Sequence, residues 1–172
     1  LETKYFDKEE PVNFRAFQII RDKPDTVCSL RKGIVISVIN NYSIDTTYTY
    51  SYSSRRNSIT IEHNDGTFAK YEGFDSDNIF INEGDVVLPN QPLGTLIQYD
   101  KRGTYQLRFA INYLMENPIE GDNKKLKNSN KYLDPYFQTA EGIVKLKPNV
   151  KYTTKTLEEI IVKELNKKEI KK

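Results

Sequence analysis

The chain has 172 residues, of which 37% are hydrophobic and 12% aromatic, and its formal net charge is +2. This length suits one domain with a small appendage, and the aromatic content is too high for a wholly disordered chain. No apolar run approaches the roughly 20 residues of a membrane span, and the charge is too small to indicate a nucleic-acid partner. One cysteine and one histidine exclude an internal disulfide and any zinc site built from several histidines.

The first half of the chain alternates between apolar and polar residues with a period of two, which is typical of β-strands. Gly33–Ile39 is predicted to be a buried strand that opens on a glycine, and residues 48–52 alternate with three tyrosines on one face. Ser58–Glu62 alternates again, and the Asn64-Asp65-Gly66 sequence after it indicates a tight hairpin with a returning strand over residues 67–71.

The second half continues in the same way up to residue 113. A short apolar run at residues 86–88 lies between turn sequences at residues 82–85 and 89–92, and a second run at residues 93–97 follows them. Residues 105–113 alternate over a longer stretch, with apolar and aromatic side chains on one face. Strands of this length and spacing indicate an all-β sandwich or barrel.

The C-terminal segment breaks this pattern. Residues 143–146 are predicted to form one more short strand, and an amphipathic helix is expected over residues 157–168. Thr156 is the expected N-cap, with Glu159 completing a capping box. The basic end of this helix is either a favourable charge at a helix C-terminus or a contact for an acidic surface.

Five segments, taken in chain order, carry a family resemblance. They are Gly33-Ile-Val, Ser58 to Gly66 followed by Tyr71, Ile81 to Val86 with Gln91 to Gly94, Gln106-Leu107-Arg108-Phe109, and Leu133-Asp134-Pro135. Together they resemble the lysostaphin/LytM-type zinc endopeptidases, which cut peptidoglycan cross-bridges. The resemblance covers residues 14–135.

The resemblance implies the family's antiparallel β-sandwich, a duplicated hybrid motif, with a short strand-plus-helix extension. We therefore divide the chain into a peptidase-like domain at residues 1–135 and an extension at residues 136–172. It also implies an exported protein, periplasmic or at the cell surface. No signal peptide stands at the beginning of this sequence, which fits an exported protein with its signal removed or a cytosolic one.

The positions that match the functional residues of the family are all substituted. The zinc ligands fall on Phe14, Gln18 and Arg108, and the two histidines that assist catalysis fall on Gly73 and Gln106. Phenylalanine offers no donor atom and arginine is a permanent cation, so these positions do not suit Zn²⁺. Without the metal the attacking water keeps its high pKa. We expect a catalytically inactive relative without zinc or any other cofactor.

An inactive peptidase groove points to binding instead of hydrolysis. Its lining would be Phe14, Gln18, Glu72, Gln106 and Arg108, and Arg108 would pair with a partner's carboxylate or with Glu72. The expected partner is peptidoglycan or a protein of the cell envelope.

Three tyrosines, Tyr48, Tyr50 and Tyr52, would stack on sugars, anchor a protein interface, or pack on a neighbouring strand. The only histidine, His63, is expected to hydrogen-bond the hairpin turn. Two alternatives remain open: an active metalloendopeptidase with an atypical carboxylate site, and a general protein-interaction domain.

Overall fold

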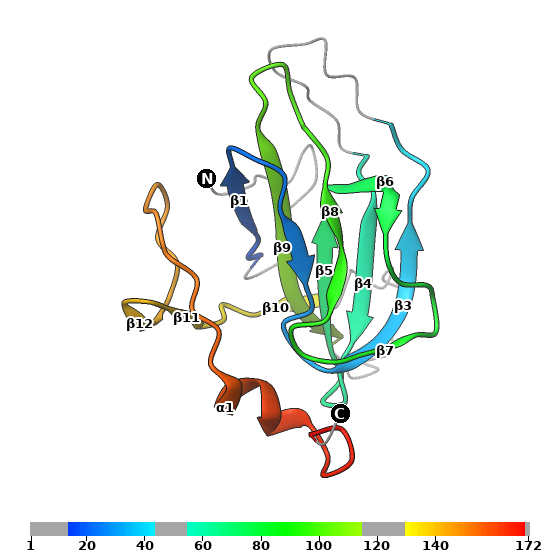
Figure 1. Cartoon of the computed structure of the whole chain (residues 1–172), viewed down its shortest axis with the longest axis vertical. Coiled ribbons are helices and arrows are strands. Elements are labelled where there is room, and N and C mark those ends of the chain that lie inside the picture. The colour runs from blue at the N-terminus through cyan, green and yellow to red at the C-terminus, as the bar shows by residue number, and fades with distance from the viewer. Residues whose placement is uncertain (1–13, 44–54, 115–129, 171–172) are drawn as a thin grey trace, which may run out of the picture.

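The computed structural model describes residues 14–43, 55–114 and 130–170, and every strand pairing within them is antiparallel (Figure 1). The largest sheet of the described residues has seven strands in the order β1-β9-β5-β4-β3-β7, with β10 also paired to β9. Their bounds are β1 Phe17–Arg21, β3 Gly33–Ile39, β4 Ser58–Glu62, β5 Thr67–Glu72, β7 Val86–Val87, β9 Tyr105–Leu114 and β10 Asn130–Tyr132. The predicted all-β fold is confirmed.

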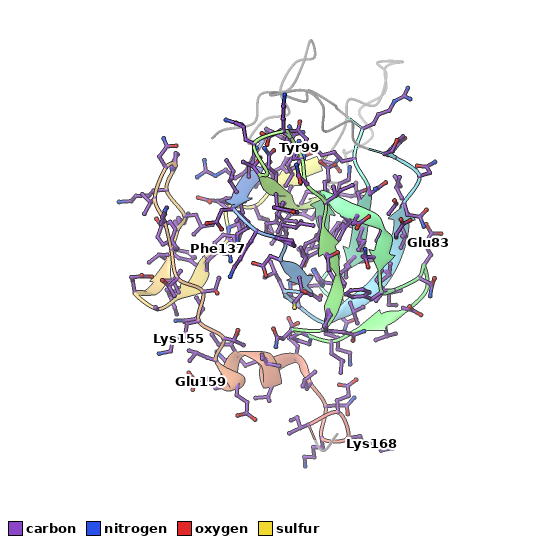
Figure 2. All side chains as sticks on the ribbon, turned by 45° about the horizontal axis from the view of Figure 1, so that its top comes forward. Glu83, Tyr99, Phe137, Lys155, Glu159 and Lys168 are labelled. Carbon is purple, nitrogen blue, oxygen red and sulfur yellow. The ribbon has the colours of Figure 1, made fainter. Side chains whose placement is uncertain are left out.

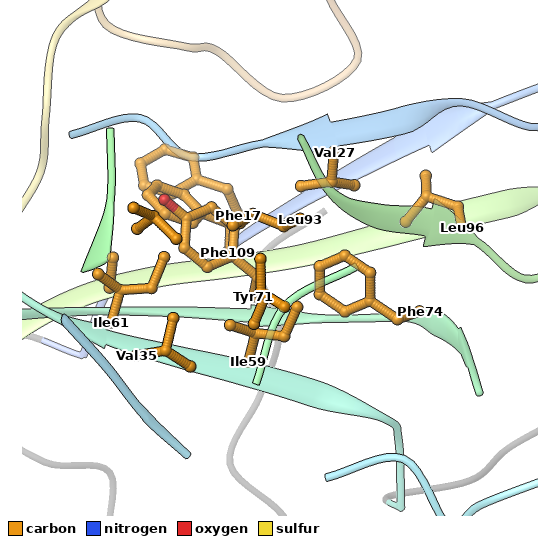
Figure 3. Close-up of a cluster of buried hydrophobic side chains, with 13 residues drawn as sticks. Phe17, Val27, Val35, Ile59, Ile61, Tyr71, Phe74, Leu93, Leu96 and Phe109 are labelled. Atoms are coloured by element: carbon orange, nitrogen blue, oxygen red, sulfur yellow. The ribbon is translucent and has the colours of Figure 1, made fainter. Parts of the chain in front are cut away.

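A second sheet of three strands lies across the large one. Its order is β2-β8-β6, with bounds β2 Thr26–Cys28, β8 Pro92–Leu96 and β6 Phe74–Ile79. Figure 3 shows side chains from both sheets meeting between them. Val27, Leu93 and Leu96 come from the small sheet, and Val35, Ile59, Ile61, Tyr71 and Phe109 come from the large one. The hydrophobic core therefore fills the space between two packed antiparallel sheets.

The alternation seen in the sequence decides which face of each strand enters this core. In β9, Phe109 is buried in the core, with Leu107 and Ile111 packed against the same cluster. Because successive side chains of a strand point to opposite faces, Gln106 and Arg108 lie on the other side of the sheet. The predicted hairpin is also confirmed: β4 and β5 pair in register, and Gly66 adopts a φ of +76° in the turn.

The segment after residue 135 contributes to the core and forms a small sheet of its own. β11 (Phe137–Thr139) pairs with β12 (Gly142–Val144), which is the strand predicted at residues 143–146. The Phe137 ring centroid lies 5.3 Å from that of Phe17, edge to face. The aromatic core of the large sheet thus extends onto this segment.

The predicted helix over residues 157–168 is wrong in length. The structure has a single α-helical turn, α1 (Glu158–Ile161), followed by a 3₁₀ turn, η1 (Val162–Glu164). Leu157, and not Thr156, precedes the helix, and no side chain caps it. Leu165 is extended and ends the helical stretch. Of the helices in the described ranges, none has the length and apolar character needed to cross a membrane.

Tertiary contacts explain why this segment departs from its amphipathic pattern. The Glu164 carboxylate accepts hydrogen bonds from the Arg31 side chain and from the Lys32 backbone N–H. The Glu169 carboxylate pairs with the Lys32 ammonium at 2.7 Å. None of the residues in α1 and η1 is buried. Polar contacts to the segment before β3 therefore position these residues, and no burial of an apolar face supports a longer helix.

Candidate binding face

Four polar side chains form a row across the outer face of the large sheet. The strand registers pair Ser58 with Glu72, Glu72 with Arg108, and Arg108 with Gln18. Residues directly opposite each other in neighbouring strands project to the same face. The row therefore runs over β4, β5, β9 and β1 on the side of the sheet that faces away from the core.

Gln106 joins this row from the next outward position of β9. Its side-chain oxygen accepts a hydrogen bond of 2.7 Å from the Gln18 amide. Gln106 itself is only 6% exposed. The structure thus brings together four of the five groove residues expected from the sequence: Gln18, Glu72, Gln106 and Arg108. We call these four residues the outer polar row.

The remaining expected positions have other surroundings. Phe14 precedes β1, and its ring meets the edge of Tyr132 in β10 at 4.8 Å between centroids. Gly73 has a φ of +116°, and a Cβ on it would lie 2.1 Å from the Gln106 carbonyl oxygen. This glycine lets the backbone between β5 and β6 approach β9 closely. Tyr48, Tyr50 and Tyr52 lie outside the described residues.

Arg56 is a member of this site that the sequence did not single out. It precedes β4, is only 4% exposed, and its Nη2 lies 3.5 Å from the Gln106 side-chain oxygen. Its guanidinium carbon lies 4.0 Å from the centroid of the Tyr99 ring, a cation–π geometry. Figure 2 labels Tyr99 at the end of the molecule opposite Lys168. Nothing in the local sequence distinguishes Arg56 from the exposed Arg55 beside it.

The two arginines of the site lack full partners within the described part of the chain. Nε and Nη1 of Arg56 and Nε of Arg108 are buried without a hydrogen-bond acceptor there. Burial lowers the pKa of Arg56, and the neighbouring charge of Arg108 lowers it further. Glu72, which the sequence offered as a partner for Arg108, is 2.6 Å from the ammonium of Lys70 instead.

The donor chemistry of the outer polar row does not fit the zinc ion that the family resemblance implies. A neutral glutamine oxygen is a weak ligand, and a guanidinium repels a dication. Across residues 14–43, 55–114 and 130–170, no three His, Cys, Asp or Glu side chains cluster in a way that could hold a metal. We therefore derive no chemical step that passes through zinc.

A second group of charged residues lies at the other end of β4 and β5. A cavity of about 280 Å³ is lined there by Arg31, Lys32, Asn64, Asp65 and Glu164. Arg31 pairs with Asp65 at 2.7 Å and also with Glu164. These contacts tie the C-terminal segment to the hairpin, and we call this group the hairpin cluster.

His63 belongs to the hairpin end and is 3% exposed. Its Nδ1 donates a hydrogen bond of 2.8 Å to the Lys32 carbonyl, and its backbone N–H bonds to Thr67 across the hairpin. Its side chain thus bonds to the segment before β3 while its backbone closes the turn. Burial lowers the pKa of the imidazole.

Comparison with known proteins adds no relative: the sequence matches no protein-family model and no curated protein.

Proposed function

We propose that this chain is a non-catalytic module of the bacterial cell envelope that binds peptidoglycan, built on a degenerate lysostaphin/LytM-type sandwich. The observation that carries the proposal is the outer polar row, in which Gln18, Glu72, Gln106 and Arg108 converge on one outward face of the large sheet. The amides and the guanidinium of this row suit hydrogen bonding to peptide and sugar groups.

The position of the single histidine supports a binding role. His63 follows the end of β4, whereas Ser58, the β4 residue opposite Glu72 of the outer polar row, lies five residues earlier. Five residues of extended chain span roughly 16 Å, so the imidazole lies far beyond proton-transfer distance of the row. The Nδ1 atom of His63 is also engaged in a hydrogen bond to the Lys32 carbonyl. A general base at the row would need a different side chain.

Co-sedimentation with purified, insoluble peptidoglycan sacculi tests the proposal. We expect the protein to sediment with the sacculi, and we expect Gln18→Ala combined with Arg108→Gln to reduce the bound fraction at least several-fold. Arg31→Gln removes the same charge at the hairpin cluster and should leave the bound fraction unchanged. A protein that stays in the supernatant would contradict the proposal.

The non-catalytic part of the proposal needs its own measurement. Incubation of sacculi with the protein should release no new peptide ends, detected by labelling free amines. The protein as purified should contain far less than one equivalent of zinc per chain by elemental analysis. Release of amines together with about one zinc per chain would show a working endopeptidase and refute the proposal that the module is non-catalytic.

A further inference from the structure

Arg108 of the outer polar row and the neighbouring Arg56 both have buried N–H groups that could bind an anion. Three of their N–H groups are buried without an acceptor in the described part of the chain: Nε and Nη1 of Arg56 and Nε of Arg108. Arginine offers five donors and no acceptor, so only an electron-rich group satisfies it. Buried polar groups are nearly always paired, which makes three unpaired N–H groups on two neighbouring arginines informative.

Among the described residues, two carboxylates near the site are already paired with other cations. Glu72 is held by Lys70, and Asp100, which follows Tyr99, is held by Arg102 at 2.7 Å. Glu72 still attracts Arg56, but burial and the charge of Arg108 outweigh this attraction, since the pKa of Arg56 is lowered. Burial is the main cause of this lowered pKa, and repulsion by the neighbouring Arg108 adds to it. A buried charge without a counter-charge is costly, and a bound anion removes that cost.

The site is also held in place before any ligand arrives. The Tyr99 ring supports the Arg56 guanidinium from one side, and the Gln106 oxygen lies against its Nη2. Gln18 in turn fixes Gln106 through their hydrogen bond. On the same face, Arg108 is half-buried, and Ile20, which pairs with Gln106, is 53% exposed.

We infer that Arg56 and Arg108 form a binding site for a carboxylate group of the ligand, an inference that rests on the proposed function of this face. Guanidinium forks match the planar geometry of a carboxylate through paired N–H donors. The stem peptides of peptidoglycan end in free carboxylates, so the amides of Gln18 and Gln106 would bind the peptide while the two arginines bind its terminus.

Calorimetric titration with N-acetyl-D-alanyl-D-alanine and with its C-terminal amide tests this assignment at one fixed ionic strength. We expect the acid to bind at least tenfold more tightly than the amide. Arg56→Met and Arg108→Gln should each abolish that preference. Arg31→Met is the matched control, since it removes one positive charge beside a cavity at the far end of the sheet, and it should keep the preference.

Thermal unfolding without ligand distinguishes a binding role of Arg56 from a structural one. Arg56→Met should leave the melting temperature unchanged or raise it, because it removes an uncompensated buried charge. A lower melting temperature with the acid preference intact would overturn the inference. Equal stabilisation of the wild type by chloride, sulfate and acetate would also overturn it, because the site would then be a general anion site.

The inference and the proposed function fail in different ways. Binding of the dipeptide acid without binding of sacculi would keep the carboxylate site and refute the peptidoglycan function. Binding of sacculi that Arg56→Met and Arg108→Gln leave intact, with equal affinity for acid and amide, would refute the carboxylate site and keep the function.

Discussion

Basic side chains lie near both ends of β4 and β5, but only those at the hairpin end are paired with carboxylates. At the hairpin cluster, Arg31 and Lys32 are neutralised by Asp65, Glu164 and Glu169. At the outer polar row, Arg56 and Arg108 keep buried donors without acceptors in the described ranges. The basic groups of the hairpin cluster are therefore used in contacts within the chain, whereas the two arginines at the other end have donors that a ligand could use.

This difference distinguishes structural charges from charges suited to a ligand. The hairpin cluster uses its ion pairs to hold the C-terminal segment against the sheet, and its side chains are partly exposed, so each pair is worth little alone. Arg56 is almost fully buried, where an unmet charge costs far more. The carboxylate of the proposed ligand would supply the acceptor that Arg56 lacks among the described residues.

The largest effect is expected at Gly73, where the backbone lies against the backbone of Gln106. Gly73→Ala would place a Cβ at 2.1 Å from the Gln106 carbonyl oxygen, in a backbone conformation with a φ of +116°. We expect a loss of about 3 kcal/mol or more in the free energy of unfolding, measured with urea.

Gly66 is the matched control at the hairpin end. It also has a positive φ, +76°, but nothing lies within 4 Å of its Cβ position. Gly66→Ala should cost only about 1 kcal/mol, which is the conformational part alone. Equal losses for the two variants would show that the contact with Gln106 is not needed.

An intermediate effect is expected at the hairpin cluster. Glu164→Gln removes the charge that pairs with Arg31 and weakens the acceptor of the Lys32 N–H. We expect a loss of about 1–2 kcal/mol in the free energy of unfolding and faster amide exchange over residues 158–170. Glu159→Gln, at an exposed position of α1, should change both quantities little. Unchanged exchange in Glu164→Gln would mean that other contacts hold the segment.

The smallest effect concerns pH and the only histidine. Burial lowers the pKa of His63 below its ordinary value near 6.5, so the folded chain favours the neutral imidazole. The stabilisation is present above that ordinary value and is lost as the pH falls below it, because the unfolded chain then takes up a proton more readily.

Unfolding at pH values from about 7.5 to about 5.5 should therefore show a decline that is absent in His63→Gln, with a difference below about 1 kcal/mol. The same decline in both proteins would assign it to carboxyl groups. Parallel measurements on Arg56→Met should retain the decline, because Arg56 lies at the other end of the sheet.

Local sequence patterns predicted the strands well and the helix poorly. The β4–β5 hairpin follows from alternation and an Asp-Gly turn, which are properties of adjacent residues. The C-terminal helix also had a suitable local pattern, yet only one α-helical turn forms. Short helices are stabilised by packing more than by propensity, and here ionic contacts to Arg31 and Lys32 replaced that packing.

The amino-acid sequence by itself determined which side of each strand is apolar, and hence that Gln106 and Arg108 lie on the outer face of the sheet. Only the tertiary structure decided that Arg56, 52 positions before Arg108, is buried beside it. Periodicity is a property of neighbouring residues, whereas the compensation of a charge depends on groups that folding brings together from distant parts of the chain.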